Sequence, residues 1–105
     1  MKFIFEVTVN PGYDPERYAA AWVEASRIIQ QAPGAQGTYL HRDLNNPDRL
    51  LAIAHWESRA ARDASDTMAD PRVKAIIATQ AEHVSIRLVG EFAEPEWSVE
   101  AGQHG

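Results

Sequence analysis

The 105-residue sequence contains no cysteine, which excludes disulfides, thiolate metal sites, iron–sulfur clusters and cysteine nucleophiles. It also lacks a long apolar run: the longest, residues 18–23, is far shorter than the ~20 residues that cross a bilayer. Basic residues are few, 10 against 15 acidic, and the net charge of −5 would repel a phosphate backbone. We therefore expect a soluble protein with no membrane or nucleic-acid partner, and, because no export signal is visible, a cytoplasmic location.

What the sequence does contain is the composition of a folded domain, with 45% hydrophobic and 24% charged residues. Alternating apolar and polar residues predict strands at residues 2–9 and 83–92, and the turn at residues 45–48 predicts a hairpin of two further strands, 36–44 and 49–56. Capping residues, twice an Asp-Pro pair, predict three helices, at residues 14–31, 58–69 and 70–82. The domain should span residues 1–92, followed by a polar tail, residues 93–105, that either moves freely or lies on a neighbouring molecule.

This order of elements, βαββαβ with the second helix broken in two, predicts a ferredoxin-like α+β fold. Its four-stranded antiparallel sheet would carry helices on one face only. Parity along the strands assigns one nearly apolar face to the helices: Phe3, Phe5, Val7, Val9, Leu40, Leu44, Leu50, Ala52, Ala54, Trp56, Val84, Ile86, Leu88 and Phe92.

The opposite face of the sheet is mixed. It carries apolar residues among polar ones, namely Ile4, Tyr39, Leu51, Ile53 and Val89. A patch of this kind exceeds what monomers usually expose, so a second copy packing sheet to sheet is expected and the protein is predicted to be a homodimer. A monomer with a partly apolar sheet surface is the alternative.

Three segments of the sequence carry a family resemblance: VTVNPGYDPERYAAAW, APGAQGTYLHRD and NNPDRLLAIAHWES. They resemble the antibiotic biosynthesis monooxygenase (ABM) domain of the dimeric α/β-barrel superfamily, over residues 1–92. The most specific parts are Pro33-Gly34 before the second strand and Trp56-Glu57-Ser58 after the third. The resemblance implies that two copies join their sheets into a barrel. It also implies, in active members, oxygen insertion into quinone-like or polycyclic aromatic substrates without metal or flavin, so no cofactor is expected.

The resemblance also implies particular site residues, and this sequence departs from several of them. In quinone-oxidising members an asparagine stands four residues before the strand-three tryptophan and a tyrosine six after it. Trp56 matches, but those two positions hold Ala52 and Arg62. A related haem-degrading branch has a histidine ligand nine or ten residues after that tryptophan, where this chain has Ser65 and Asp66. Haem degradation is therefore not expected.

Aromatic residues are the first candidates for a binding site. Trp56, Trp22 and Tyr18 should converge with Phe5 between sheet and helices, where their rings would hold a planar aromatic ligand by stacking. Ordinary core packing is the alternative, because aromatic residues at helical spacing commonly fill volume. The many alanines in the same layers either leave a cavity between the rings or allow close helix packing.

Titratable residues are the second group of candidates. His41 and His55 are candidate bases that would remove a phenolic proton, although parity points His55 away from Trp56 unless the strand register slips at a bulge. The spacing of the histidines matches no metal-binding motif, so no metal is expected. Arg87 would either balance an enolate or quinone oxygen or pair with Glu6 on the neighbouring strand.

The sequence thus predicts a cofactor-independent monooxygenase-like protein that acts on a small aromatic, quinol-type or polycyclic compound. Trp56, His41 and His55 are the predicted catalytic residues. The predicted ligand-binding residues are Phe5, Tyr18, Trp22 and Arg87. The alternative is a non-catalytic dimeric barrel that binds a metabolite or serves as an assembly module, and the missing asparagine and tyrosine favour it.

Overall fold

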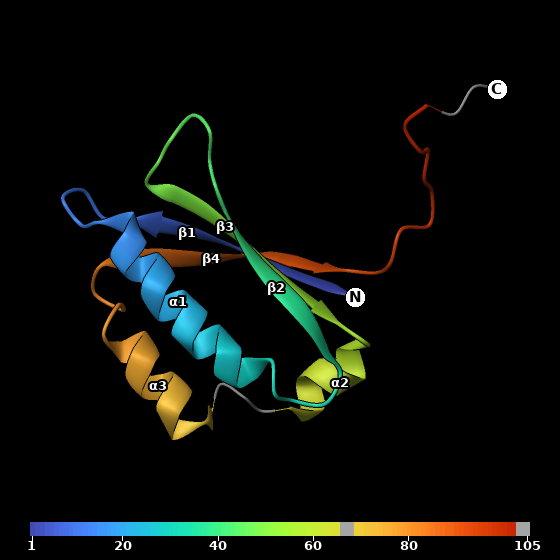
Figure 1. Ribbon diagram of the computed structural model, residues 1–105, viewed down its shortest axis with the longest axis horizontal. Coiled ribbons are helices and arrows are strands. Elements are labelled where there is room, and N and C mark those ends of the chain that lie inside the picture. Colours follow the sequence, from blue (N-terminus) through green and yellow to red (C-terminus); the bar gives the residue numbers. More distant parts are fainter. Residues whose placement is uncertain (66–68, 103–105) are drawn as a thin grey trace.

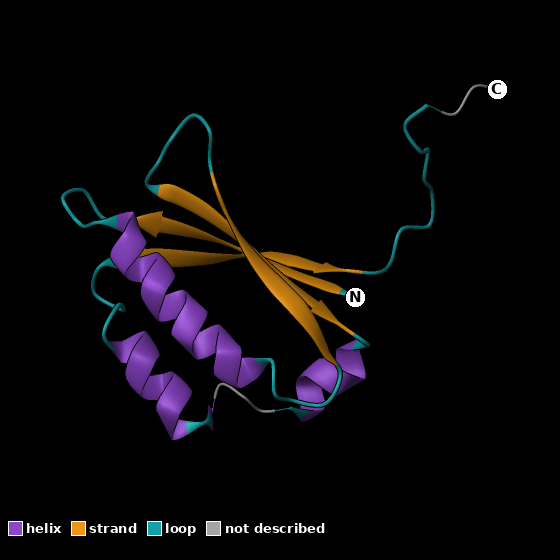
Figure 2. Ribbon diagram, in the orientation of Figure 1, coloured by secondary structure: helices purple, strands orange, loops and turns teal. Residues whose placement is uncertain are grey.

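A computed structural model describes residues 1–65 and 69–102 of the chain. Its elements are β1 (Lys2–Val9), α1 (Pro15–Ile29), β2 (Ala35–Arg42), β3 (Arg49–Trp56), α2 (Arg59–Ala64), α3 (Pro71–Ala78) and β4 (Val84–Phe92). The strands, orange in Figure 2, form one antiparallel sheet, and their order is β2-β3-β1-β4. All three helices lie on one face of it (Figure 1). The predicted ferredoxin-like α+β fold is therefore confirmed.

The two longer helices begin as the sequence predicts. The Asp14 carboxylate accepts a hydrogen bond from the Glu16 amide at 2.9 Å, and Asp70 accepts one from the Arg72 amide at 2.8 Å. A proline follows each cap, at a position whose missing N–H no helical hydrogen bond needs. Hydrogen bonds from Arg72, first from its side chain and then from its amide, lower the pKa of Asp70 to about 2. These caps fix where α1 and α3 start above the sheet.

The helix ends differ from the prediction. α1 ends at Ile29, because the amides of Gln31 and Ala32 donate to carbonyls three residues back instead of four, and the Gln30 side chain accepts a hydrogen bond from the Gly37 amide at 2.7 Å. α2 ends at Ala64, and residues 66–68 of the predicted helix lie outside the described residues. α3 ends at Ala78, and hydrogen-bonded turns carry the chain to β4.

Strand parity predicts most of the two sheet faces and fails at two points. β2 ends at Arg42, so Leu44 lies in the following turn, fully exposed, and does not face the helices. In β4 the register shifts: Ile4 pairs with Gly90 but Phe5 with Leu88, which leaves Val89 as the extra residue of a β-bulge.

The bulge reverses the orientation of the strand residues after it. Phe92 pairs with Lys2 and therefore lies on the face without helices, contrary to the prediction. Glu91 pairs with Phe3 and lies on the helix-covered face in its place. An extra residue in a period-two pattern exchanges the two faces from that point onward.

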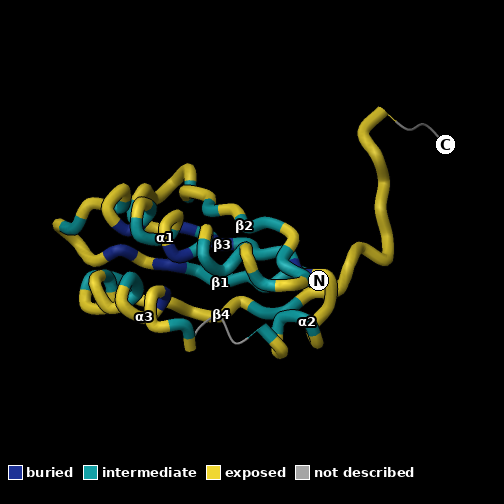
Figure 3. The backbone as a smooth tube through the Cα atoms, turned by 60° about the horizontal axis from the view of Figure 1, so that its bottom comes forward, coloured by how far each residue is buried: buried dark blue, intermediate teal, exposed yellow. Residues whose placement is uncertain are grey.

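The helical layer covers the sheet unevenly. The core forms where α1 lies over the central strands, around Val7, Val9, Tyr18 and Leu50 (Figure 3). α3 packs mainly against α1, and β4 beneath it stays poorly covered. Ile86 and Leu88 face the helices yet are 57% and 56% exposed. Part of the helix-facing side of β1 and β4 is therefore free to line a cavity.

The C-terminal residues leave the sheet. After Phe92 the chain runs away from the body of the domain (Figure 1), and Trp97 is 87% exposed. Residues 103–105 of the predicted tail lie outside the described residues. No helix in the described part of the chain has the length and apolar character needed to span a membrane.

Alanine substitutions at Gly34 and Gly12 test how closely α2 packs against the chain at Gly34. Both have a positive φ, +86° and +87°, so an alanine at either position pays a backbone cost of about 1–2 kcal/mol. A Cβ on Gly34 would also lie 2.6 Å from the Cβ of Ala61 in α2, whereas one on Gly12 would meet nothing within 4 Å. Gly34→Ala should therefore lower the unfolding free energy by about 1–3 kcal/mol more than Gly12→Ala, measured by urea denaturation. Equal losses would contradict the close approach of α2.

Candidate functional site

A cavity of about 570 Å³ lies between the helices and the sheet. This volume falls within the range of about 300–1,000 Å³ typical of small-molecule sites. Its walls come from α1, α3, β1 and β4, with β2, β3 and α2 contributing at one end. Ile86 and Leu88 complete the wall at β4, which explains why these apolar side chains remain accessible on the helix-facing side.

Four aromatic residues that the sequence predicts to converge all line this cavity. Phe5 comes from β1, Tyr18 and Trp22 from successive turns of α1, and Trp56 from the end of β3. Ala21 and Ala25 lie on the same face of α1 and also line the cavity, and their small side chains leave space between the rings. The rings are thus part of the core and part of a cavity wall at once. Trp56 is only 4% exposed.

Tyr18 marks one end of the cavity. Its ring packs against Val7, Val9 and Leu50, near the end of β1. The side chain is 6% exposed, and its hydroxyl makes no hydrogen bond to any residue in the described ranges. Burial raises the pKa of Tyr18 to about 12. The group is therefore a neutral phenol with a hydrogen bond to offer.

The other end of the cavity is polar. Ser26, Gln30, Thr38, Arg62 and Asp63 line it around Trp56. Gln30 Nε2 is buried and has no hydrogen-bond partner among the described residues. In the sequence, Arg62 stands out only as a departure from the family pattern. A helix as short as α2 has too few residues for their spacing to indicate which of its faces meets the sheet.

His41 and His55 lie on the other side of the sheet. His41 pairs with Leu51 across β2 and β3, and His55 pairs with Lys2, so both share the face without helices. The His55 ring meets the ring of Tyr39 edge-on, with centroids 5.6 Å apart. The register between β1 and β3 shows no slip at His55, so the structure does not bring either histidine to the cavity beside Trp56.

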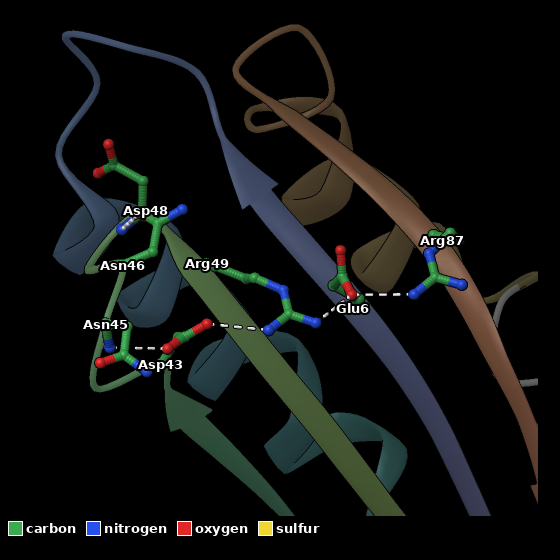
Figure 4. Close-up of polar contacts among 7 residues, drawn as sticks. All are labelled: Glu6, Asp43, Asn45, Asn46, Asp48, Arg49 and Arg87. Carbon is green, nitrogen blue, oxygen red and sulfur yellow. Dashed lines mark hydrogen bonds and ion pairs between the residues drawn. The ribbon is translucent and has the colours of Figure 1, made fainter.

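Arg87 also lies on the face without helices and does not reach the cavity. Its Nη2 lies 3.0 Å from Glu6 Oε2, which confirms the predicted cross-strand pair (Figure 4). Arg49 contacts the same oxygen at 2.8 Å and Asp43 at 2.9 Å. Hydrogen bonds from Arg49, and then from Arg87, lower the pKa of Glu6, and Arg49 likewise lowers the pKa of Asp43.

Metal-binding residues do not gather anywhere in the described ranges. No three histidine or carboxylate side chains lie close enough there to hold an ion. The groups available for chemistry at the cavity are therefore its aromatic rings, Arg62, Asp63 and neutral hydrogen-bonding side chains.

The family model for antibiotic biosynthesis monooxygenases matches residues 1–79. The chain belongs to this family. No curated protein matches the ABM chain in sequence. The family assignment therefore rests on the family model, and the similarity to solved structures concerns the fold.

Two solved structures illustrate the shared fold. SnoaB from Streptomyces nogalater, described as a cofactor-independent oxygenase, superposes with a TM-score of 0.71 at 16% identity, over 90% of this chain and 96% of SnoaB. A Chloroflexus aurantiacus protein, provisionally described as an antibiotic biosynthesis monooxygenase, superposes with a TM-score of 0.64 at 20% identity, over 99% and 95% of the two chains. At these identities the similarity shows the fold alone.

The raised pKa of Tyr18 predicts a pH dependence of stability. Native Tyr18 keeps its proton up to about pH 12, whereas an unfolded tyrosine releases it near pH 10, so the native state is penalised as the pH rises through this window. The full effect is about 2–3 kcal/mol. Between pH 9 and pH 11 the wild type should lose about 1 kcal/mol more unfolding free energy than Tyr18→Phe, measured by urea denaturation. Identical losses in the two proteins would show that the hydroxyl is not desolvated.

Proposed function

We propose that this ABM-family chain is a cofactor-independent monooxygenase that binds a small aromatic, quinol-type or polycyclic compound in the cavity between helices and sheet. The observation that carries the proposal is a cavity of ligand size whose walls include Phe5, Tyr18, Trp22 and Trp56. Aromatic rings favour offset or edge-to-face contacts with other rings, so this wall suits a flat, electron-rich ligand. Membership of a monooxygenase family supports the reaction class.

The chemistry in this proposal belongs largely to the substrate. Loss of a proton from a phenol or an activated methylene gives an electron-rich anion, which transfers electrons to molecular oxygen. When a methylene becomes a carbonyl, one oxygen atom enters the product and the other leaves as water with the two hydrogens. The cavity contributes by orienting the substrate.

A proton acceptor is needed at the cavity itself. His41 and His55, the bases expected from the sequence, are separated from the cavity by the sheet. Asp63 is the carboxylate among the lining residues, and it lies 3.6 Å from Arg62 Nη1. We assign proton acceptance to Asp63, because it is the carboxylate in the cavity wall, and the neighbouring guanidinium of Arg62 would stabilise the anion that the substrate becomes.

Oxygen uptake with anthrone as substrate tests this proposal. Trp56→Ala removes a ring from the cavity wall and should lower kcat/KM at least tenfold, while Asp63→Asn should lower kcat and leave binding largely unchanged. Trp97→Ala is the matched control, because this tryptophan lies in the tail and is 87% exposed. It should retain wild-type turnover. Unchanged turnover in Trp56→Ala would remove the catalytic proposal.

A non-catalytic binding module is the second candidate function. Ala52 and Arg62 support it, because they stand where the resemblance expects an asparagine and a tyrosine. Tryptophan fluorescence distinguishes the two. Anthrone that quenches the wild-type emission without any oxygen uptake would favour the binding module, since the ligand then occupies the cavity without reacting.

We further propose that the protein is a homodimer that joins the two uncovered sheet faces. Tyr39 and Phe92 on this face are 54% and 48% exposed. Ile4, Leu51 and Ile53 lie between them, partly exposed. A second copy would remove this apolar area from water, at a gain of roughly 25 cal/mol per Å².

Light scattering tests the dimer. The wild type should show twice the chain mass of 11.7 kDa, and Ile53→Asp should shift the protein to a single chain mass, because a carboxylate in the middle of an apolar interface loses its hydration. Ile53→Val, which keeps the apolar surface, should remain dimeric. A wild type that stays at 11.7 kDa at micromolar concentration would refute the proposal.

A further inference from the structure

Arg62 is held firmly at the polar end of the cavity. Its guanidinium lies over the ring of Phe3, 3.8 Å from the centroid, which is close enough for a cation–π contact. Its Nη1 also lies 2.8 Å from Glu91 Oε1. Glu91 reaches this position because the β-bulge turns it toward the helices, where it pairs with Phe3. A ring beneath it and a carboxylate beside it thus fix the orientation of Arg62.

The guanidinium keeps hydrogen-bonding capacity in this position. An arginine side chain has five N–H donors, and the contacts of Arg62 with Glu91 and Asp63 both involve Nη1. Its Nε and Nη2 make no hydrogen bond to any residue in the described ranges. Arg62 is 30% exposed and lines the cavity, so a ligand can reach it.

Arg62 and Asp63 are the charged residues that line the cavity, and Arg62 is the less exposed of the two, at 30% against 63%. Glu91 is shared, because its Oε2 lies 2.7 Å from Arg59 Nη2, so one carboxylate faces two guanidinium groups. Asp63 lies farther from Arg62, at 3.6 Å, and its side chain is 63% exposed, so water screens its charge. The rest of the wall is largely apolar, and a charge inside such a wall is screened less than one in bulk water.

We propose that Arg62 is the specificity-determining residue of the cavity and selects aromatic ligands that carry an anionic oxygen, either a carboxylate or a phenolate. Arg62 is the cation among the lining residues, and Tyr18 at the opposite end offers a neutral hydroxyl. The anionic oxygen therefore binds at the Arg62 end, beside Trp56, and the ring system extends toward Tyr18. This inference rests on the proposed function in one respect, namely that the cavity binds an aromatic ligand.

Fluorescence titration with two anthracene probes tests the proposal. Anthracene-2-carboxylate and anthracene-2-methanol share one ring system and differ in charge. The wild type should bind the carboxylate about tenfold more tightly, the order of magnitude of one charge-assisted hydrogen bond. Arg62→Gln should abolish this preference and leave the affinity for the alcohol nearly unchanged. Arg59→Gln is the matched control: it removes the same charge from the same short helix, contacts the same Glu91, and does not line the cavity, so it should keep the preference.

A third probe distinguishes the two kinds of anionic oxygen. The colour of 2-hydroxyanthraquinone reports its ionisation, and binding to the wild type should lower the apparent pKa of this phenol by about one unit, while binding to Arg62→Gln should not. An anion preference with either oxygen supports the proposal and identifies the acid group. Equal affinity for the two anthracene probes with no shift in the phenol would overturn it and leave the proposed function standing. Failure of every probe to bind would overturn both.

Discussion

The one-sided and incomplete helical layer is the constraint on which the rest of this structure depends. A ferredoxin-like sheet carries its helices on a single face, and here α3 packs mainly against α1, not on β4. The part of the sheet left without a helix above it still carries apolar side chains, Ile86 and Leu88 among them. Such a surface is unfavourable in water, and a bound apolar molecule would relieve it. The cavity follows from this arrangement together with the small side chains of Ala21 and Ala25.

The same constraint separates two kinds of chemistry onto two faces. The helix-covered face holds the aromatic rings that line the cavity and the guanidinium of Arg62, while the uncovered face holds His41, His55 and the ion-pair network of Glu6, Arg49 and Arg87 (Figure 4). Because neighbouring residues on a strand point to opposite faces, His55 and Trp56 are adjacent in the chain and yet cannot contact one ligand. Their separation follows from strand geometry.

Strand periodicity and helix caps predicted the order of the elements, the sheet and the face on which the aromatic residues meet. Those signals are local: an Asp-Pro pair starts each longer helix, and β1 and β3 pair without a register shift, so strand parity holds along both. Periodicity failed for Phe92, because an isolated glycine such as Gly90 suggests a bulge in a strand but does not indicate which residue is extra. It failed for Leu44, because the turn after β2 begins two residues earlier than the polar sequence suggests.

The polar end of the cavity was beyond sequence reasoning for a related reason. Arg62 lies on a helix too short to show a periodic apolar face, and its partner Glu91 takes its orientation from the bulge. The irregularity in β4 therefore does more than bend an edge strand. It places Glu91, and not Phe92, on the helix-covered face of the sheet. This part of the face therefore carries a carboxylate that binds the guanidinium of Arg62. Insertion of one amino acid into an edge strand is thus a route by which a fold of this kind changes the charged groups that surround its cavity, without altering any side chain in the cavity wall.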